Sequence, residues 1–298
     1  MEQSVLSPKP SVDVYQLVTN TIITQLEKGV IPWQQPWEGG KCNIPGFPVN
    51  HVTGSRYRGI NILLLWSSTL EKGYSSKEWA SFKQWNSKNE SVRKGEKGNL
   101  VVYYDTIEKE IDGETQKIPF LKRSYVFNRC QLTSFIADEK KENEPVPSLV
   151  EKIEIVDQFL SPLNLDLKTD DKFPCYSPTK DCIYMPRMES FKDTATCTAT
   201  EGYYSSLLHE LTHWTGHEKR LNRKGGKRFG DQAYAFEELC AELGAAFLCS
   251  GFSISTLEKG DHAAYIDHWL KALNENKKLV FAASSEASKA VEYLYSLK

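Results

Sequence analysis

Apolar residues fall at helical spacing in two stretches near the start of the chain. The first stretch predicts a helix over residues 11–28, with Ser11 as its N-cap and Gly29 as the residue that ends it. An apolar run at residues 59–70 predicts a second helix. Residues 1–10 show no such periodicity, and we expect them to form a flexible arm. The apolar face of the first helix consists of Val14, Leu17, Val18 and Ile22.

Strand-like segments occur in both halves of the chain. Residues 100–104 and 125–132 predict two strands joined by a polar hairpin through Asp112 and Gly113. Shorter strand-like pieces lie at residues 173–176 and 182–185. Helical patterns in the back half are predicted at residues 150–160, 203–215, 234–250, 262–274 and 282–297. This mixture of strands and separate helices predicts an α+β fold.

A charged segment divides the chain. Residues 137–147 contain prolines and few apolar residues, which is typical of a linker. We therefore predict domains at residues 1–136 and 150–298, joined by a linker over residues 137–149. The length of 298 residues agrees with two domains, and 40% hydrophobic residues can supply their cores.

The two predicted halves differ in charge, although the whole chain carries a net charge of only −2. Residues 1–136 hold 17 basic and 13 acidic residues, for a net charge of +4. Residues 137–298 hold 20 basic and 26 acidic residues, for a net charge of −6. A basic front half and an acidic back half suggest two separate tasks.

Cysteine usage and the N-terminal sequence bear on the compartment. Seven cysteines, an odd number without a CxxC pair, argue against a disulfide framework and a zinc knuckle. The first residues lack the basic and apolar regions of a signal peptide, and no apolar run approaches 18 residues. We expect a cytoplasmic protein with reduced thiols and no membrane partner.

The run HELTHWTGH carries the strongest chemical signal in the chain. His209 and His213 are four residues apart, so on a helix they share one face and can ligate one ion. Zinc suits imidazole ligands, although Mn²⁺ or another transition metal is an alternative. Glu210 lies beside the first ligand, where it can act as the general base that takes a proton from water. Gly216 is expected to end this helix.

A third ligand is expected from the helix predicted at residues 234–250. We favour Glu238 as the ligand, and we expect Glu242, four residues later on the same face, to hydrogen-bond a histidine ring. His217 is the rival third ligand, but it comes two residues too early for the pattern in which a third histidine completes the site.

Two further features fit a peptidase-type site. Residues 181–186 predict a strand, which we interpret as an edge strand that binds extended peptide by strand addition. Tyr234 is a candidate donor to a transition-state oxyanion. Tyr203 is a second candidate, although a place in the core suits it better.

Basic and aromatic residues alternate in the front half. Nine basic and four acidic residues lie between Arg56 and Lys97, with tryptophans and tyrosines among them. Cations can follow a phosphate backbone and exposed aromatic rings can stack on bases, although these aromatic residues could also be core. The candidate DNA contacts are Arg56, Arg58, Trp79, Lys83, Trp85, Arg93, Lys94 and Lys97.

A second basic segment separates the two predicted ligand helices. Residues 218–232 start where one ligand helix ends and finish where the next begins, so they must lie at the rim of the metal site. The segment includes a glycine pair and six cations. A solvated loop is the simpler interpretation, and contact with bound DNA is the alternative. The six cations are Lys219, Arg220, Arg223, Lys224, Lys227 and Arg228.

Several motifs resemble those of ArdC-type antirestriction proteins. GFPVNHVTGSRYRGIN (46–61) and VRKGEKGNLVVYY (92–104) are similar to the N-terminal domain of that family. HELTHWTGH, RLNR (220–223) and YAFEELCAELGAAF (234–247) are similar to its C-terminal zincin-like domain. The resemblance implies a small mixed α/β domain that binds single-stranded DNA, followed by a mostly helical metallopeptidase-type domain with a small sheet.

The same resemblance implies a plasmid-borne protein that helps conjugative DNA evade restriction in the bacterial recipient cell. It implies His209, His213 and Glu238 as zinc ligands and Glu210 as the base, acting on an unidentified protein substrate. Two other functions stay open at this point. One is a pure DNA-binding shield with a silent metal site, and the other is a metallopeptidase whose basic domain docks a protein partner.

Overall fold

The computed structural model describes residues 13–34, 46–111, 114–135, 148–170, 172–194, 197–223, 232–256 and 262–297. Helix α1 (Val14–Glu27) follows Asp13, whose carboxylate accepts hydrogen bonds from two backbone N–H groups of the first turn. Asp13 is therefore the N-cap, whereas Ser11, the predicted cap, lies outside the described residues. Gly29 has a φ of +77° just past the helix, so the predicted end is confirmed.

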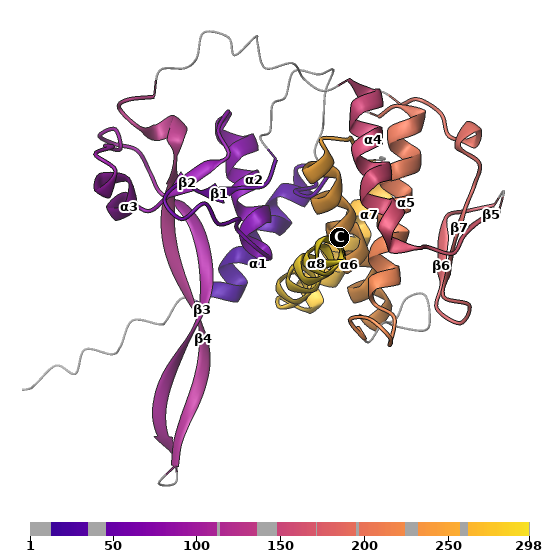
Figure 1. Ribbon diagram of the computed structural model, residues 1–298. Coiled ribbons are helices and arrows are strands. Elements are labelled where there is room, and N and C mark those ends of the chain that lie inside the picture. Colours follow the sequence, from indigo (N-terminus) through magenta and orange to yellow (C-terminus); the bar gives the residue numbers. More distant parts are fainter. Residues whose placement is uncertain are drawn as a thin grey trace, which may run out of the picture.

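The front half contains a four-stranded sheet in the order β1-β2-β4-β3. Strands β3 and β4 pair without interruption from Asn99 opposite Val126 to Ile111 opposite Glu114. Their far end projects from the body as a two-stranded ribbon (Figure 1), so the predicted hairpin is much longer than expected. The strands are β1 (Val49–Asn50), β2 (Glu78–Ala80), β3 (Asn99–Ile111) and β4 (Glu114–Asn128).

Two helices accompany this sheet. Helix α2 (Ile60–Lys72) packs on β3, and the short helix α3 (Phe82–Ser87) follows β2. A capping box between Ser81 and Gln84 starts α3. Trp79 thus lies on strand β2 and Trp85 on helix α3.

The back half combines helices with a three-stranded sheet in the order β5-β7-β6. Helix α6 lies centrally and packs on both α5 and α8. The strands are β5 (Leu167–Thr169), β6 (Cys175–Ser177) and β7 (Cys182–Met185). The helices are α4 (Leu149–Leu160), α5 (Ala199–Thr215), α6 (Gln232–Phe252), α7 (His262–Glu275) and α8 (Leu279–Ser296), with 3-10 turns at Ser161–Leu163 and Met188–Ser190. A further 3-10 turn, Arg129–Gln131, follows β4 in the front half.

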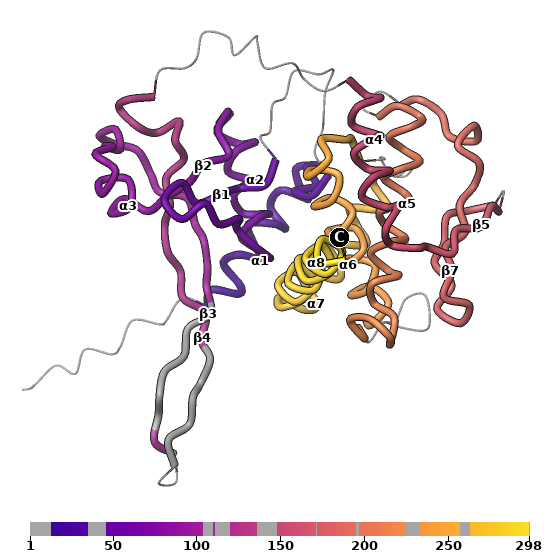
Figure 2. The backbone as a smooth tube through the Cα atoms, in the orientation of Figure 1, coloured from indigo at the N-terminus to yellow at the C-terminus, as the bar shows by residue number. Residues whose placement is uncertain are grey.

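The main hydrophobic core extends across both halves. Val18 and Ile22 of α1 belong to the same buried cluster as Trp269 of α7 and Phe281 of α8. The hydroxyl of Thr19 donates to the carbonyl of residue 277 at 2.7 Å. The chain path in Figure 2 accordingly brings α1 beside the C-terminal helices. The two domains are therefore joined by shared packing as well as by the chain, while their exact boundary stays a prediction.

Neither a disulfide nor a membrane-spanning helix occurs among the described residues. The six cysteines in these segments are free thiols, and five of them are buried. No helix in the described part of the chain is both long and apolar enough to cross a bilayer.

Candidate metal centre

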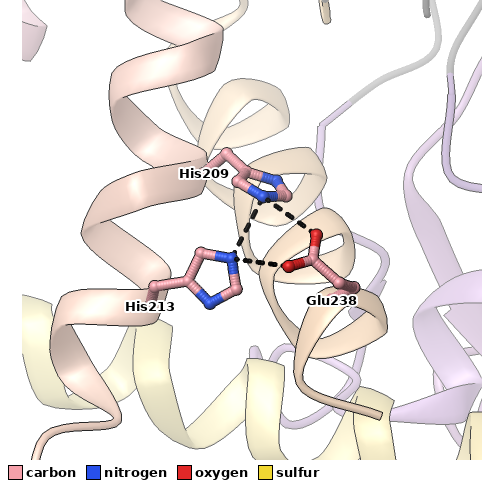
Figure 3. A group of neighbouring side chains, drawn as sticks. All are labelled: His209, His213 and Glu238. Atoms are coloured by element: carbon pink, nitrogen blue, oxygen red, sulfur yellow. Dashed lines mark hydrogen bonds and ion pairs between the residues drawn. The ribbon is translucent and has the colours of Figure 1, made fainter. Parts of the chain in front are cut away.

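Helices α5 and α6 bring two histidines and one glutamate together. A capping box between Thr198 and Glu201 starts α5. His209 and His213 project from one face of it with their Nε2 atoms 3.2 Å apart. Glu238 of α6 faces them, with carboxylate oxygens 3.7 Å and 3.6 Å from those two nitrogens (Figure 3).

This cluster has the composition of a three-ligand metal site. One donor atom from each of His209, His213 and Glu238 lies within 4.8 Å of the other two. Two imidazole nitrogens and a carboxylate oxygen form a ligand set that zinc accepts in open, catalytic sites. Burial would raise the pKa of Glu238, but the hydrogen bond with His209 and both imidazoles lower it to about 2. The donor set therefore fits a divalent cation.

His217, the rival third ligand, lies outside this cluster in the described part of the chain. Its Nδ1 atom accepts a hydrogen bond from the backbone N–H of residue 219 and lies 4.0 Å from the carboxylate of Asp181. Helix α5 ends at Thr215, so His217 no longer follows the helical face of the two ligands.

Glu237 forms a hydrogen bond with His213 of the cluster. Its Oε1 atom lies 3.1 Å from Nδ1 of His213. The guanidinium of Arg223 donates to both Glu237 oxygens, at 2.8 Å and 3.1 Å. Glu242 lies one helical turn beyond Glu238, about 6 Å farther along the axis. There it lines the same cleft. Burial is the main cause that raises the pKa of Tyr265, and the charge of Glu242 raises it further.

Glu210 is held in place by backbone. Its Oε2 atom accepts a hydrogen bond of 2.7 Å from the N–H of Tyr176 in β6, and the residue is 8% exposed. Arg220 fastens this strand, because its guanidinium donates to Asp181 and to the Tyr176 hydroxyl and stacks 3.8 Å from the ring centre of Trp214. The Arg220 hydrogen bond lowers the pKa of Asp181 to about 2.

The cluster lies in a cleft of about 1340 Å³. Tyr234 lines this cleft beside Glu238, and burial followed by the Glu238 charge raises the pKa of its phenol to about 12. Tyr203 instead packs edge-on against Phe191 and Tyr204. Of the two tyrosines considered from the sequence, Tyr234 is therefore the one that reaches the cleft.

The prediction that residues 181–186 form an edge strand is wrong. Strand β7 is central and is paired on both sides, whereas β6 is the edge beside the cleft. The N–H of Tyr176 points away from β7 toward Glu210, so alternation directs the N–H groups of Cys175 and Ser177 toward β7. Pro174 and Pro178 have no N–H. Residues 174–178 thus offer carbonyl acceptors but no spare donor along this edge.

Two predicted DNA contacts in the front half are core residues. Trp79 and Trp85 are each 1% exposed, and the indole of Trp85 donates to the carbonyl of Phe127 at 2.9 Å. A tryptophan among cations has the same sequence signature whether it is buried or exposed, and packing decides. The exposed aromatic side chains in the described front half are Phe82, Tyr103 and Tyr125.

All six predicted cationic contacts are exposed, and the three arginines among them also have partners within the protein. Arg58 pairs with Glu292 at 2.8 Å, and Arg93 pairs with Glu96 while donating to two backbone carbonyls. Arg56 lies over the rings of Phe47 and Tyr295. Lys83, Lys94 and Lys97 are exposed.

Two arginines of the basic segment between helices α5 and α6 are less available for contact with DNA than the sequence suggested. Arg220 and Arg223 both point inward and are engaged as described. Lys224, Lys227 and Arg228 lie outside the described residues. The positioning roles of Glu237, Tyr176 and Asp181 were missed, because each depends on a contact between distant elements.

Comparison with known proteins places each half of the chain. A family model described as the N-terminal domain of anti-restriction factor ArdC matches residues 12–127. Another, described as a zincin-like metallopeptidase, matches residues 154–286. Over 299 residues the chain is 32% identical to an uncharacterized protein of Sinorhizobium fredii, covering 97% of this chain and 94% of that protein. It is also 32% identical to the DNA primase TraC of Escherichia coli over 305 residues, which cover 95% of this chain but 27% of the primase.

Solved structures agree with these matches. The metal-free crystal structure of the antirestriction ArdC protein from the R388 plasmid superposes with a TM-score of 0.76 at 38% identity, covering 96% of this chain and 97% of that one. The Mn(II)-bound structure of that protein gives a TM-score of 0.74 at 36% identity, covering 96% and 98%.

Proposed function

Because this chain belongs to the ArdC antirestriction family, we propose that it combines two activities in plasmid-associated antirestriction. The front domain binds single-stranded DNA, and the zincin-like domain hydrolyses peptide bonds of a protein near that DNA. The setting we propose is the cytoplasm of a bacterial recipient cell that conjugative DNA has entered.

The observation that carries the peptidase part is the grouping of His209, His213 and Glu238 around one point, with Glu210 beside them. These three side chains would hold a divalent cation, zinc in our proposal. Such an ion supplies Lewis acidity to a reacting carbonyl and makes water a stronger nucleophile near neutral pH.

The chain's own residues would then move and hold protons. Glu210 would accept a proton from the attacking water, while the N–H of Tyr176 holds its carboxylate in one orientation. The Tyr234 phenol keeps its proton near neutral pH because its pKa is raised to about 12. It can therefore donate a hydrogen bond to the oxyanion that develops on the substrate carbonyl.

Charge and family support the DNA-binding part. The front half has a net charge of +4, and it exposes lysines together with aromatic rings. Cations and ring faces are the two features by which proteins hold single strands without reading sequence.

One experiment tests both parts. Wild type, Glu210→Gln and His213→Ala would be assayed for metal content, for casein cleavage with zinc or manganese, and for binding of a labelled oligothymidylate. We expect wild type to hold about one metal ion, and His213→Ala to lose it because two ligands bind far more weakly than three. Glu210→Gln should keep metal and DNA binding but lose cleavage. Equal cleavage by Glu210→Gln and wild type would refute the peptidase mechanism.

One observation favours the alternative of a DNA-binding shield with a silent metal site. The β6 edge lacks a spare N–H donor, so the usual backbone pairing with an extended peptide is weakened there. Metal-loaded wild type that binds DNA but cleaves no protein would favour the shield.

A further inference from the structure

Two exposed aromatic side chains in the front half lie on one continuous strip of surface. Phe82 at the start of α3 and Tyr125 of β4 are each 50% exposed. Phe127 lies between them, because residues two apart on a strand share a face. The Phe82 and Phe127 rings meet edge to face with centroids 6.2 Å apart. We call Phe82, Phe127 and Tyr125 the aromatic strip.

A glycine keeps this strip free of a competing side chain. Gly98 lies just before β3, next to Tyr125 and Phe127. A Cβ atom at this position would lie 2.8 Å from Cβ of Tyr125 and 3.3 Å from the Phe127 ring. Any larger residue would therefore push the Tyr125 side chain aside. The absence of a side chain at Gly98 thus allows Tyr125 to occupy its position.

Exposed cations are sequence neighbours of the strip or share its face. Lys83 and Lys97 are exposed and adjoin Phe82 and Gly98 in the chain. Arg123 is also exposed, and it shares the face of Tyr125 because it lies two residues earlier on β4. The nearby carboxylate of Glu96 is already engaged by Arg93 and Gln131. The surroundings of the strip therefore favour an anionic ligand.

We propose that the aromatic strip is the surface on which bases of single-stranded DNA stack, with Lys83, Lys97 and Arg123 contacting the phosphates. This inference rests on the proposed DNA-binding function and assigns it to particular residues. Duplex DNA hides its base faces, so exposed aromatic rings favour the single strand, whose bases are free to stack. The half-exposed Phe82 ring packs against Phe127, so it can stack on a base with little loss of side-chain freedom.

The chain provides a matched control on the opposite face of the same hairpin. Tyr103 of β3 is 43% exposed and pairs directly across from Lys122. The register places Tyr125 opposite Leu100, three residues from Tyr103, so alternation directs the two tyrosines to opposite faces. Tyr103→Ala and Tyr125→Ala thus remove the same group from opposite faces of one hairpin.

The test measures affinity for a labelled oligothymidylate in the full-length chain at several salt concentrations. We expect Tyr125→Ala and Phe82→Leu each to weaken binding about 10-fold, and the double variant about 100-fold, because each lost stack is worth that order. Their salt dependence should match that of wild type, since no phosphate contact is lost. Lys97→Gln with Arg123→Gln should instead flatten the salt dependence. Tyr125→Phe should bind like wild type, because the ring face is retained.

The outcomes separate this inference from the function on which it rests. Wild-type affinity in the Phe82→Leu, Tyr125→Ala double variant, or equal losses for Tyr103→Ala and Tyr125→Ala, would overturn the strip while DNA binding stands. A wild-type chain that binds no oligonucleotide would overturn the proposed function and the strip together. Circular dichroism and metal content of each variant would establish that the fold is retained. We expect the Phe82 and Tyr125 variants to be folded and still to bind the oligonucleotide more weakly than wild type.

Discussion

At the scale of single residues, the candidate metal site depends on residues other than the three that would hold the ion. Glu237 accepts a hydrogen bond from Nδ1 of His213, which assigns the proton to that nitrogen and leaves Nε2 free to ligate. Arg223 holds Glu237 with two hydrogen bonds and is itself 2% exposed. Gly216 leaves room for this arginine, since a Cβ there would lie 2.8 Å from its guanidinium.

The first prediction compares two glutamates of α6. Glu237→Gln should weaken metal binding roughly 10- to 100-fold, because it loses the charged partner that orients His213. Glu242→Gln should change it little, since Glu242 lies a turn away. A chelator competition measures both affinities. Equal losses in the two variants would contradict the role assigned to Glu237.

The second prediction concerns the ion pair that fastens β6. Asp181 has a pKa lowered to about 2 in the folded chain, against about 3.9 unfolded. Its contribution to stability is therefore present above the unfolded pKa and is lost as the pH falls through 3.9 toward 2. Arg220→Gln should lower the free energy of unfolding by about 2 kcal/mol near pH 7. The difference from wild type in urea denaturation should shrink below about pH 4, whereas a constant difference would exclude this pair as its source.

At the scale of elements, the site depends on how closely α5 and α6 approach. Gly244 of α6 faces Thr212 of α5, and a Cβ at Gly244 would lie 2.4 Å from the Thr212 methyl group. Thr212 is fully buried and its hydroxyl is bonded within α5. This close contact sets the spacing at which Glu238 can reach the two histidines.

The third prediction follows from that spacing. Gly244→Ala should destabilise the chain by about 1–3 kcal/mol through overpacking, and it should also weaken metal binding by displacing Glu238. Gly251→Ala, in the same helix, is the control, since its Cβ would meet only the ends of the Tyr295 and Phe47 side chains at 3.2 Å and 3.3 Å. Urea denaturation measures the loss of stability in both variants. A larger loss at Gly251 would argue against the tight α5–α6 contact.

The helices and the pairing of His209 with His213 were predictable from the sequence because both follow local periodicity. The apolar pattern placed α5 and α6, and four-residue spacing placed His209 and His213 on one face. Contacts between distant elements were not predictable. Alternation could not reveal that β7 is central, and charge pattern could not reveal that Trp79 and Trp85 are buried. The hydrogen bond from His213 to Glu237 was missed, because residue spacing ignores the direction in which Nδ1 of His213 points.

At the scale of the whole molecule, the two halves share a core. Helix α1 precedes the front sheet in sequence but packs on α7 and α8, and the backbone N–H of Gly59 donates to the Ser288 hydroxyl at 2.8 Å. The charged segment at residues 137–147 predicts a linker, yet the domains it joins are also bound by buried apolar contacts.

The fourth prediction is a consequence of this shared core. Thermal unfolding of the full chain should occur in one cooperative transition, because separating the halves would expose the apolar face of α1. Calorimetry with equal calorimetric and van't Hoff enthalpies would support this. Two well-separated transitions would show that the halves unfold independently.

The prolines on either side of β6 have a consequence for crowding. If the chain binds single-stranded DNA as proposed above, copies bound along one strand would lie close together. A free sheet edge at the mouth of each cleft would then recruit the same edge of a neighbouring copy. Pro174 and Pro178 withhold the donors that such pairing needs, and Glu210 occupies the remaining one. The cleft can therefore remain open in a dense array, where self-association would otherwise close it.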